Sequence, residues 1–247
     1  MQQMTDIIFK HLIDKNDCLV YNLTVTKYLG GLMKKKIYFF DMDGTLVDSM
    51  QWGWEKVILK YLDDRNIKYP DTIITDLVTK GFMGIANHYV NVLGVKETPQ
   101  ALYNHFMVSL DDMYLYEYPE KPGATEAIKR LKEKGYSVNV ISGSPLRFVI
   151  PCLKRLGLYE LLDNVFSLEE FGYTKSDKEL FLKLAEKMDA SPEDCTVIDD
   201  SVNAIKTAKS AGFHTIGIYE AIVKYTWEEM QRTAEKTITS FHELTVE

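Results

Sequence analysis

Residues 37–47 read IYFFDMDGTLV. The first four residues form a nearly unbroken apolar run, which is the pattern of a strand buried on both faces of a parallel sheet. The run stops abruptly at Asp41, and a polar turn that contains Gly44 follows. The sequence therefore predicts a buried strand that ends in carboxylates.

Strands and helices alternate downstream of this stretch. Further strands are expected at 136–141, 164–167, 195–198 and 214–218, the last of them closing the series. Helices are expected between them, one opening at Pro122, one over about 146–156, one over 176–188 and one from Ala204. Such alternation predicts βαβ units, and hence an α/β fold with a Rossmann-like parallel sheet covered by helices on both faces.

Residues 48–120 interrupt the alternation. Amphipathic helices are expected around 52–61 and 101–113, with no strong strand between them. We therefore divide the chain into an N-terminal extension of uncertain role (1–33), a Rossmann-like core (34–47 and 121–218), an inserted helical cap (48–120) and a partly helical C-terminal segment (219–247). The hinges of the cap are expected near 48–50 and 119–122.

Composition narrows the possible partners and the compartment. Lys and Arg number 29 against 36 Asp and Glu, a net charge of −7, so the chain has no general attraction for nucleic acid. No apolar run approaches the ~18 residues of a membrane span, and charges interrupt the N-terminal segment, which argues against a signal peptide. The three cysteines, Cys18, Cys152 and Cys195, are far apart and odd in number, which indicates reduced thiols. We expect a cytoplasmic monomer or homodimer with no nucleic-acid or membrane partner.

Polar side chains gather where three of the predicted strands end. Asp41 and Asp43 follow the first strand, Ser142 ends another, and Asp199 and Asp200 close the strand at 195–198. Ligands of such sheets bind at the carboxyl ends of the strands, so these groups should share one edge. Up to four carboxylates in a small volume repel one another without a cation. Mg²⁺ is the hard ion that best suits oxygen ligands.

Four motifs in order give the chain a resemblance to the haloacid dehalogenase-like superfamily, in its phosphatase branch. FDMDGTLV (40–47) resembles the first motif, VISG (140–143) the second, KSDKELF (175–181) the third and VIDDS (197–201) the fourth. The resemblance covers about residues 35–218. It points to members similar to phosphoglycolate phosphatase and β-phosphoglucomutase, whose helical cap is inserted after the first motif.

The resemblance implies a Mg²⁺-dependent phosphatase that acts on a small phosphorylated metabolite. Asp41 is then the nucleophile that forms an aspartyl-phosphate, and Asp43 is the general acid and base. Ser142, Gly143 and Lys175 are implied to bind the phosphoryl group, Lys175 by adding positive charge beside the nucleophile. The implied metal ligands are Asp41, Asp200, the backbone carbonyl of Asp43 and, as ligand or as an orienting group, Asp199.

Some assignments stay open at this stage. Lys178 competes with Lys175 for the third-motif role, because Ser176 replaces the proline that relatives often have there. Lys175 fits that role better, because it keeps the spacing to Leu180 and Phe181. Lys56 and Lys60 leave open a phosphonate-cleaving enzyme with a cap lysine, whereas Asp43 disfavours dehalogenation. A sugar phosphomutase and a non-catalytic binding protein on the same fold are the alternative functions.

The cap sequence favours a small substrate. Residues 48–120 hold 6 Lys and Arg against 11 Asp and Glu, a balance unsuited to a polyanion. The glycine-flanked stretch 80–84 is a candidate loop that reaches the site. Trp52, Trp54 and Phe82 are expected either to touch the substrate or to pack in the cap's own core.

Overall fold

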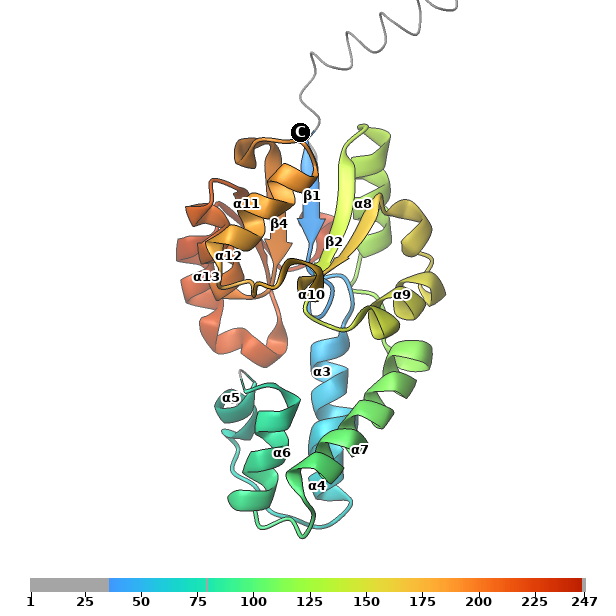
Figure 1. Cartoon of the computed structure of the whole chain (residues 1–247), viewed down its shortest axis with the longest axis vertical. Coiled ribbons are helices and arrows are strands. Elements are labelled where there is room, and N and C mark those ends of the chain that lie inside the picture. The colour runs from blue at the N-terminus through green and yellow to red at the C-terminus, as the bar shows by residue number, and fades with distance from the viewer. Residues whose placement is uncertain (1–35, 79, 246–247) are drawn as a thin grey trace, which may run out of the picture. The chain divides into compact units, whose positions relative to one another are not determined.

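A computed structural model describes residues 36–78 and 80–245, so the predicted extension 1–33, with Cys18, lies outside the described residues. Within them the chain forms a six-stranded sheet in the order β3-β2-β1-β4-β5-β6, and every neighbouring pair is parallel (Figure 1). The strands are β1 (Ile37–Phe40), β2 (Ser137–Ser142), β3 (Asn164–Ser167), β4 (Cys195–Asp199), β5 (His214–Ile218) and β6 (Lys236–Ile238). The expected α/β architecture is confirmed.

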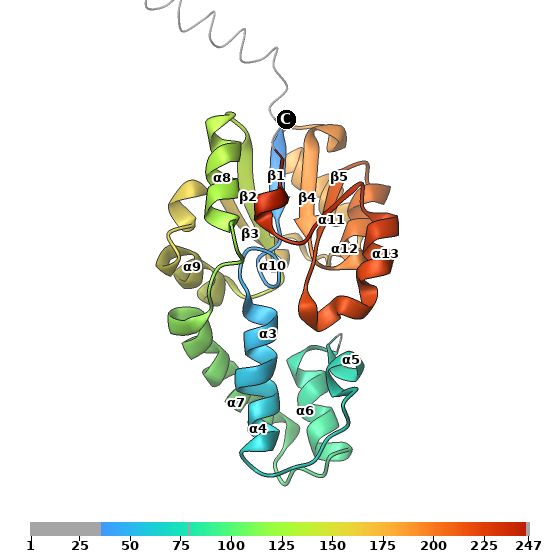
Figure 2. The ribbon, with the colours of Figure 1, turned by 180° about the vertical axis from the view of Figure 1, so that it is seen from behind.

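Both faces of the central strand β1 are buried, as its continuous apolar run predicts. Tyr38 and Phe40 belong to one core cluster, with α8 (Ala124–Glu133) and α9 (Leu146–Arg155). Ile37 and Phe39 belong to a second cluster on the other face, with helices of the second half of the chain. Figures 1 and 2 show the helices on the two sides of the sheet. The helices of the second cluster are α11 (Lys178–Lys187), α12 (Val202–Ser210) and α13 (Trp227–Thr233).

Short helical turns connect these elements. They are α10 (Leu168–Phe171) and the 3₁₀ turns η3 (Tyr159–Leu161), η4 (Pro192–Asp194), η5 (Ala221–Thr226) and η6 (Phe241–Glu243). None of the helices in the described part of the chain is long and apolar enough to span a membrane.

The segment between β1 and α8 is helical, and we call residues 49–117 the insertion. The helix expected around 52–61 is present as one run of α3 (Ser49–Gly53), the π-helical η1 (Trp54–Leu59) and α4 (Lys60–Asp63). The helix expected at 101–113 is α7 (Pro99–Asp112), which continues into the π-helical η2 (Met113–Glu117). The prediction of a loop at 80–84 is wrong, because Lys80 caps α6 (Gly81–Asn91), and α5 (Ile73–Leu77) precedes it.

The two chain segments that enter and leave the insertion pair with each other. Asp48 N donates to the Pro119 carbonyl at 2.9 Å, and Lys121 N donates to the Leu46 carbonyl at 2.8 Å. The Lys121 ammonium also binds Glu220 at 2.5 Å and Asp48 at 3.2 Å, and Glu220 is buried. The linkers are therefore fastened to each other and to the C-terminal part of the chain.

The C-terminal segment contains one more strand than expected. The strand at 214–218 is not the last, because β6 pairs with it from Ile216↔Lys236 to Ile218↔Ile238. Three residues are too few for an apolar period to be recognised, so this strand could not be predicted from the pattern of apolar residues. Beyond β6, Phe241 is fully buried against Phe40, with ring centroids 5.8 Å apart.

The Phe241 side chain is therefore expected to hold the C-terminal segment on the core. Replacing it by Ala should lower the free energy of unfolding by about 3–5 kcal/mol, because the buried ring leaves a cavity. The melting temperature should fall by roughly 6–15 °C. Tyr225→Ala, at a side chain that is 50% exposed, is the control and should change stability by no more than about 0.5 kcal/mol. Equal, small effects of both changes in thermal unfolding would contradict this role.

Candidate active site

Strand register brings the predicted polar groups to one edge of the sheet. Phe40 is aligned with Val140 of β2 and with Ile198 of β4. The next residue, Asp41, donates its backbone N–H to the Ile198 carbonyl at 2.9 Å, which places it beside the end of β4. Because the strands are parallel, the carboxyl ends of β1, β2 and β4 meet here.

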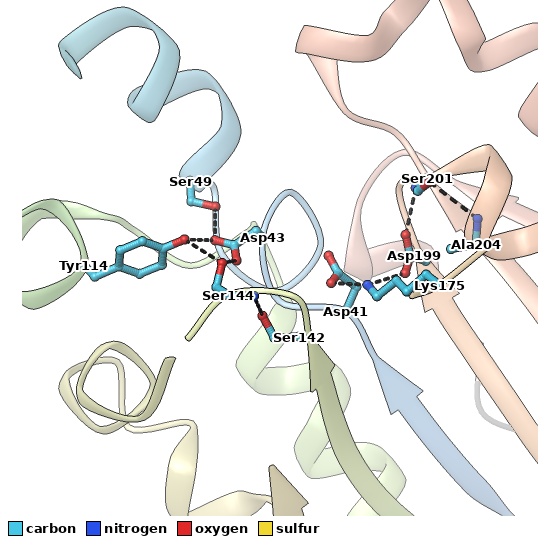
Figure 3. Close-up of polar contacts among 10 residues, drawn as sticks. All are labelled: Asp41, Asp43, Ser49, Tyr114, Ser142, Ser144, Lys175, Asp199, Ser201 and Ala204. Atoms are coloured by element: carbon cyan, nitrogen blue, oxygen red, sulfur yellow. Dashed lines mark hydrogen bonds and ion pairs between the residues drawn. The ribbon is translucent and has the colours of Figure 1, made fainter. Parts of the chain in front are cut away.

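Lys175 joins the carboxylates of two strands (Figure 3). Its ammonium donates to Asp41 Oδ1, and to Asp199 Oδ2 at 2.7 Å. The lysine lies in the loop between α10 and α11, where Thr174 N and Oγ1 both donate to Asp177 Oδ2, at 2.8 and 2.7 Å. Lys178, the competing candidate, is exposed in the first turn of α11. The loop therefore presents Lys175 to the carboxylates.

Three carboxylates are close enough to share an ion. One oxygen each of Asp41, Asp199 and Asp200 lies within 4.8 Å of the others. Both oxygens of Asp199 already accept hydrogen bonds, from Lys175 and from Ser201 N at 2.8 Å. Gly44 has φ +82°, and a Cβ at this position would lie 2.7 Å from Asp200 Oδ2. Glycine is thus needed for the turn and for the close approach of Asp200.

The electrostatics of this cluster favour a bound cation. Burial raises the pKa of Asp41 to about 7, against the lowering effect of Lys175, and the Asp199 and Asp43 carboxylates add to the rise. Burial, followed by the charges of Asp199 and Asp41, raises the pKa of Asp200 well above its usual range. Burial alone would lower the pKa of Lys175, but Asp199 and Asp41 outweigh it and raise that pKa. One ammonium does not balance this concentration of carboxylates.

Asp43 has a separate set of partners on the side of the insertion. Ser49 Oγ and Tyr114 OH each donate to its Oδ1 at 2.6 Å, and Ser144 Oγ donates to its Oδ2 at 2.7 Å. Figure 3 shows the carboxylate of Asp43 among these hydroxyls, while that of Asp41 faces Lys175. Three separate elements, α3, η2 and the β2–α9 turn, thus fix the orientation of Asp43.

The turn at residues 142–144 contains two predicted site residues, Ser142 and Gly143, and a third, Ser144, that was not predicted. Ser142 is fully buried, and its Oγ accepts the Ser144 N–H at 3.0 Å. Gly143 and Ser144 reach the pocket described below. Ser144 could have been predicted as a site residue, because it lies in the same polar turn. No feature of the sequence pointed to Ser49 or Tyr114, and Tyr114 is 71 residues from Asp43 in the chain.

Two pockets meet at Asp43. The first, which we call the phosphate pocket, measures about 280 Å³. The second, the leaving-group pocket, measures about 200 Å³ and lies against the insertion. They share Asp43 and Ser144. The phosphate pocket is lined by Asp41, Asp43, Gly143, Ser144, Leu168 and Lys175. The leaving-group pocket is lined by Asp43, Ser49, Met50, Gly53, Trp54, Ile58, Phe82, Leu110, Tyr114, Tyr118 and Ser144.

The structure separates the aromatic and lysine candidates of the insertion. Trp54 and Phe82 line the leaving-group pocket, but Trp52 packs under the Lys56 ammonium, 3.7 Å from the ring centroid. Lys56 also pairs with Glu117, and Lys60 pairs with Asp64, in both cases with largely exposed side chains. Neither lysine lines either pocket, so the structure gives no support for a cap lysine that reacts with substrate.

This geometry suits group transfer to a carboxylate. A strand-end carboxylate and an ammonium face one small pocket, and a second carboxylate stands where that pocket meets another. The chain belongs to the family of haloacid dehalogenase-like hydrolases, whose model matches residues 35–212.

Two relatives of the chain are named as phosphatases. The chain is 25% identical over 193 residues to a phosphoglycolate phosphatase from Psychrobacter arcticus, covering 75% of this chain and 84% of the relative. It is 27% identical over 183 residues to hexitol phosphatase B from Escherichia coli K12, covering 72% and 80%. A magnesium-bound hydrolase of this type from Bacillus subtilis shares the fold, with TM-score 0.67, 20% identity and coverage of 85% and 97%.

The crowded carboxylates predict a stability gain when one is neutralised. The raised pKa means that folded Asp200 keeps its proton at a pH where the unfolded chain has lost it. Wild-type stability therefore falls as pH rises above about 4, whereas Asn has no proton to lose. In EDTA, Asp200→Asn should raise the melting temperature at pH 8 by at least about 3 °C, and by less at pH 5. Asp71→Asn, at an exposed position, is the control; a lower melting temperature of Asp200→Asn at pH 8 would contradict the crowding.

Proposed function

We propose that this protein is a Mg²⁺-dependent phosphatase that hydrolyses a small phosphorylated metabolite through an aspartyl-phosphate on Asp41. The observation that carries the proposal is the phosphate pocket, in which the Asp41 carboxylate, the Lys175 ammonium and Asp43 face one space of about 280 Å³. The phosphatase names of the relatives support the same reaction class.

In the first step an Asp41 oxygen attacks phosphorus, and the bond from phosphorus to the ester oxygen breaks. The Lys175 ammonium lowers the repulsion between carboxylate and phosphoryl group. Asp43 stands at the junction of the two pockets, which is where the leaving oxygen must lie when the phosphoryl group occupies the phosphate pocket. A protonated Asp43 donates its proton to that oxygen.

In the second step water attacks the aspartyl-phosphate, and Asp43, now ionised, accepts the proton of the water. Ser49, Tyr114 and Ser144 hold its carboxylate in place by hydrogen bonds. Inorganic phosphate leaves and Asp41 is regenerated.

The acidic cluster fits Mg²⁺ by its donor set. Asp41 and Asp200 supply oxygens within 4.8 Å of each other and carry raised pKa values, which a cation would relieve. Asp199 has both oxygens engaged, so its role fits the orientation of Lys175 better than direct ligation. The carbonyl of Asp43 is the further proposed ligand. The ion supplies charge neutralisation at the phosphoryl oxygens. The magnesium-bound relative with this fold supports the choice of metal.

A cytoplasmic location, a monomeric or homodimeric state, and the lack of nucleic-acid and membrane partners stay predictions from composition. The acidic balance of residues 48–120 supports a small substrate in place of a polyanion.

The chemistry is tested by phosphate release from p-nitrophenyl phosphate. Wild-type protein should release phosphate with Mg²⁺ and not with EDTA. Asp41→Asn should lower kcat by at least about 1000-fold, because an amide is not a nucleophile for phosphorus. Asp71→Asn should match the wild type. Isomerised product from a sugar phosphate, in place of free phosphate, would identify a phosphomutase, and no turnover by the wild type on a broad panel would favour a binding protein.

Metal binding should depend on pH. Asp41, with its pKa raised to about 7, and Asp200, with a raised pKa, must both lose protons to bind Mg²⁺. The rise in melting temperature on adding Mg²⁺ should therefore be larger at pH 8 than at pH 6. Asp200→Asn should lose most of this rise at both values. Equal stabilisation of wild type and variant would remove Asp200 from the metal site.

A further inference from the structure

We propose that the substrate is a phosphomonoester of a short, uncharged and mainly apolar alcohol, which the leaving-group pocket accommodates. The inference rests on the proposed phosphatase function and names the substrate class of that site. It follows from where the two pockets join, from the chemistry of the lining, and from how the nearby charged and polar groups are already engaged.

The two pockets form a continuous path from phosphorus to the alcohol. Asp43 and Ser144 line both of them. With the phosphoryl group between Asp41 and Lys175, the ester oxygen lies at Asp43 and the carbon body of the alcohol extends into the leaving-group pocket. The residues beyond Asp43 therefore select the alcohol.

The far part of that pocket is a carbon surface. Trp54, Ile58 and Leu110 are buried, and Phe82 forms the rim with 39% of its surface exposed. Gly53 lets the Tyr118 hydroxyl pack closely against α3, because a Cβ there would lie 2.8 Å from that hydroxyl. Such a lining gains free energy by burying alkyl or aromatic groups.

No basic side chain faces the alcohol. Among the described residues that line the leaving-group pocket there is no lysine, arginine or histidine. Arg155 approaches from outside, but its guanidinium donates to the backbone carbonyls of Tyr114 and Tyr118, at 3.3 and 2.5 Å. Lys56 is paired with Glu117. Lys175 is paired with two carboxylates in the phosphate pocket.

Three of the four side-chain hydroxyls that line the pocket are engaged, and the fourth, that of Tyr118, is a neutral donor. The hydroxyls of Ser49, Tyr114 and Ser144 all donate to Asp43. A carboxylate or a second phosphate on the substrate would lose its hydration here, and no basic side chain lines the pocket to replace it. An uncharged alkyl or aromatic group has no such cost. The pocket thus disfavours acids such as phosphoglycolate.

An isosteric pair of esters tests the inference. Isobutyl phosphate and phosphoglycolate differ by the replacement of a carboxylate with an isopropyl group of nearly the same shape. With Mg²⁺, kcat/KM for isobutyl phosphate should exceed that for phosphoglycolate by at least about tenfold. An equal or higher kcat/KM for phosphoglycolate would overturn the inference while leaving the phosphatase function standing.

A charge placed at the rim should change this preference. Phe82→Arg puts a guanidinium beside the leaving-group pocket, at a partly exposed position that tolerates charge. The ratio of the two kcat/KM values should shift toward phosphoglycolate by at least about tenfold. Val108→Arg adds the same charge to the insertion at a side chain that is 65% exposed and lines neither pocket, and it should leave the ratio unchanged. Equal effects of both variants would overturn the inference.

A binding measurement separates failure of the pocket inference from failure of the proposed function. If wild-type protein hydrolyses neither ester nor p-nitrophenyl phosphate, the proposed function fails. Titration calorimetry with 3-methylbutylphosphonate and 3-phosphonopropionate, which cannot be hydrolysed, still tests the pocket. Binding of 3-methylbutylphosphonate that is at least about tenfold tighter than that of 3-phosphonopropionate supports the inference. Equal or weaker binding of 3-methylbutylphosphonate overturns it.

Discussion

The carboxylates at the ends of β1 and β4 lie close together and repel one another. Parallel register puts Asp41 beside Asp199 and Asp200, and burial raises the cost of their charges. Lys175 offsets part of that cost. The stability must come from elsewhere, namely from a sheet whose apolar strands are covered on both faces. An edge so rich in negative charge is suited to holding a cation and an anionic group together.

The second carboxylate of the first motif connects the sheet to the insertion. Asp43 follows β1, yet two of its three hydroxyl partners come from α3 and η2. Any movement of η2 away from the end of β1 must break the Tyr114–Asp43 hydrogen bond. The paired linkers, fastened by Lys121 to Glu220, limit where such movement can occur. The orientation of Asp43 and the position of the insertion are therefore one coupled property.

The two pockets differ in the chemistry of their linings. The phosphate pocket combines carboxylates, one ammonium and a glycine-containing turn, and it comes from the segments that directly follow β1, β2 and β3. The leaving-group pocket is made largely by the insertion and is mainly apolar. In the reaction that we propose, residues of the sheet edge act on the phosphoryl group and residues of the insertion contact the alcohol.

The sequence alone determined the parallel sheet, the inserted helices and the acidic edge, because burial on both faces imposes a continuous apolar run and the motifs follow strands directly. It also favoured Lys175 over Lys178, as the structure places them. It could not show β6, whose three residues carry no period, or α6, whose glycines suggested a loop. The hydrogen-bond partners of Asp43 and the lining of the leaving-group pocket become visible only in the folded chain. The spacing of apolar residues reflects only which side of a strand or helix is buried. A contact such as Tyr114–Asp43 depends instead on how the two segments that enter and leave the insertion pair with each other.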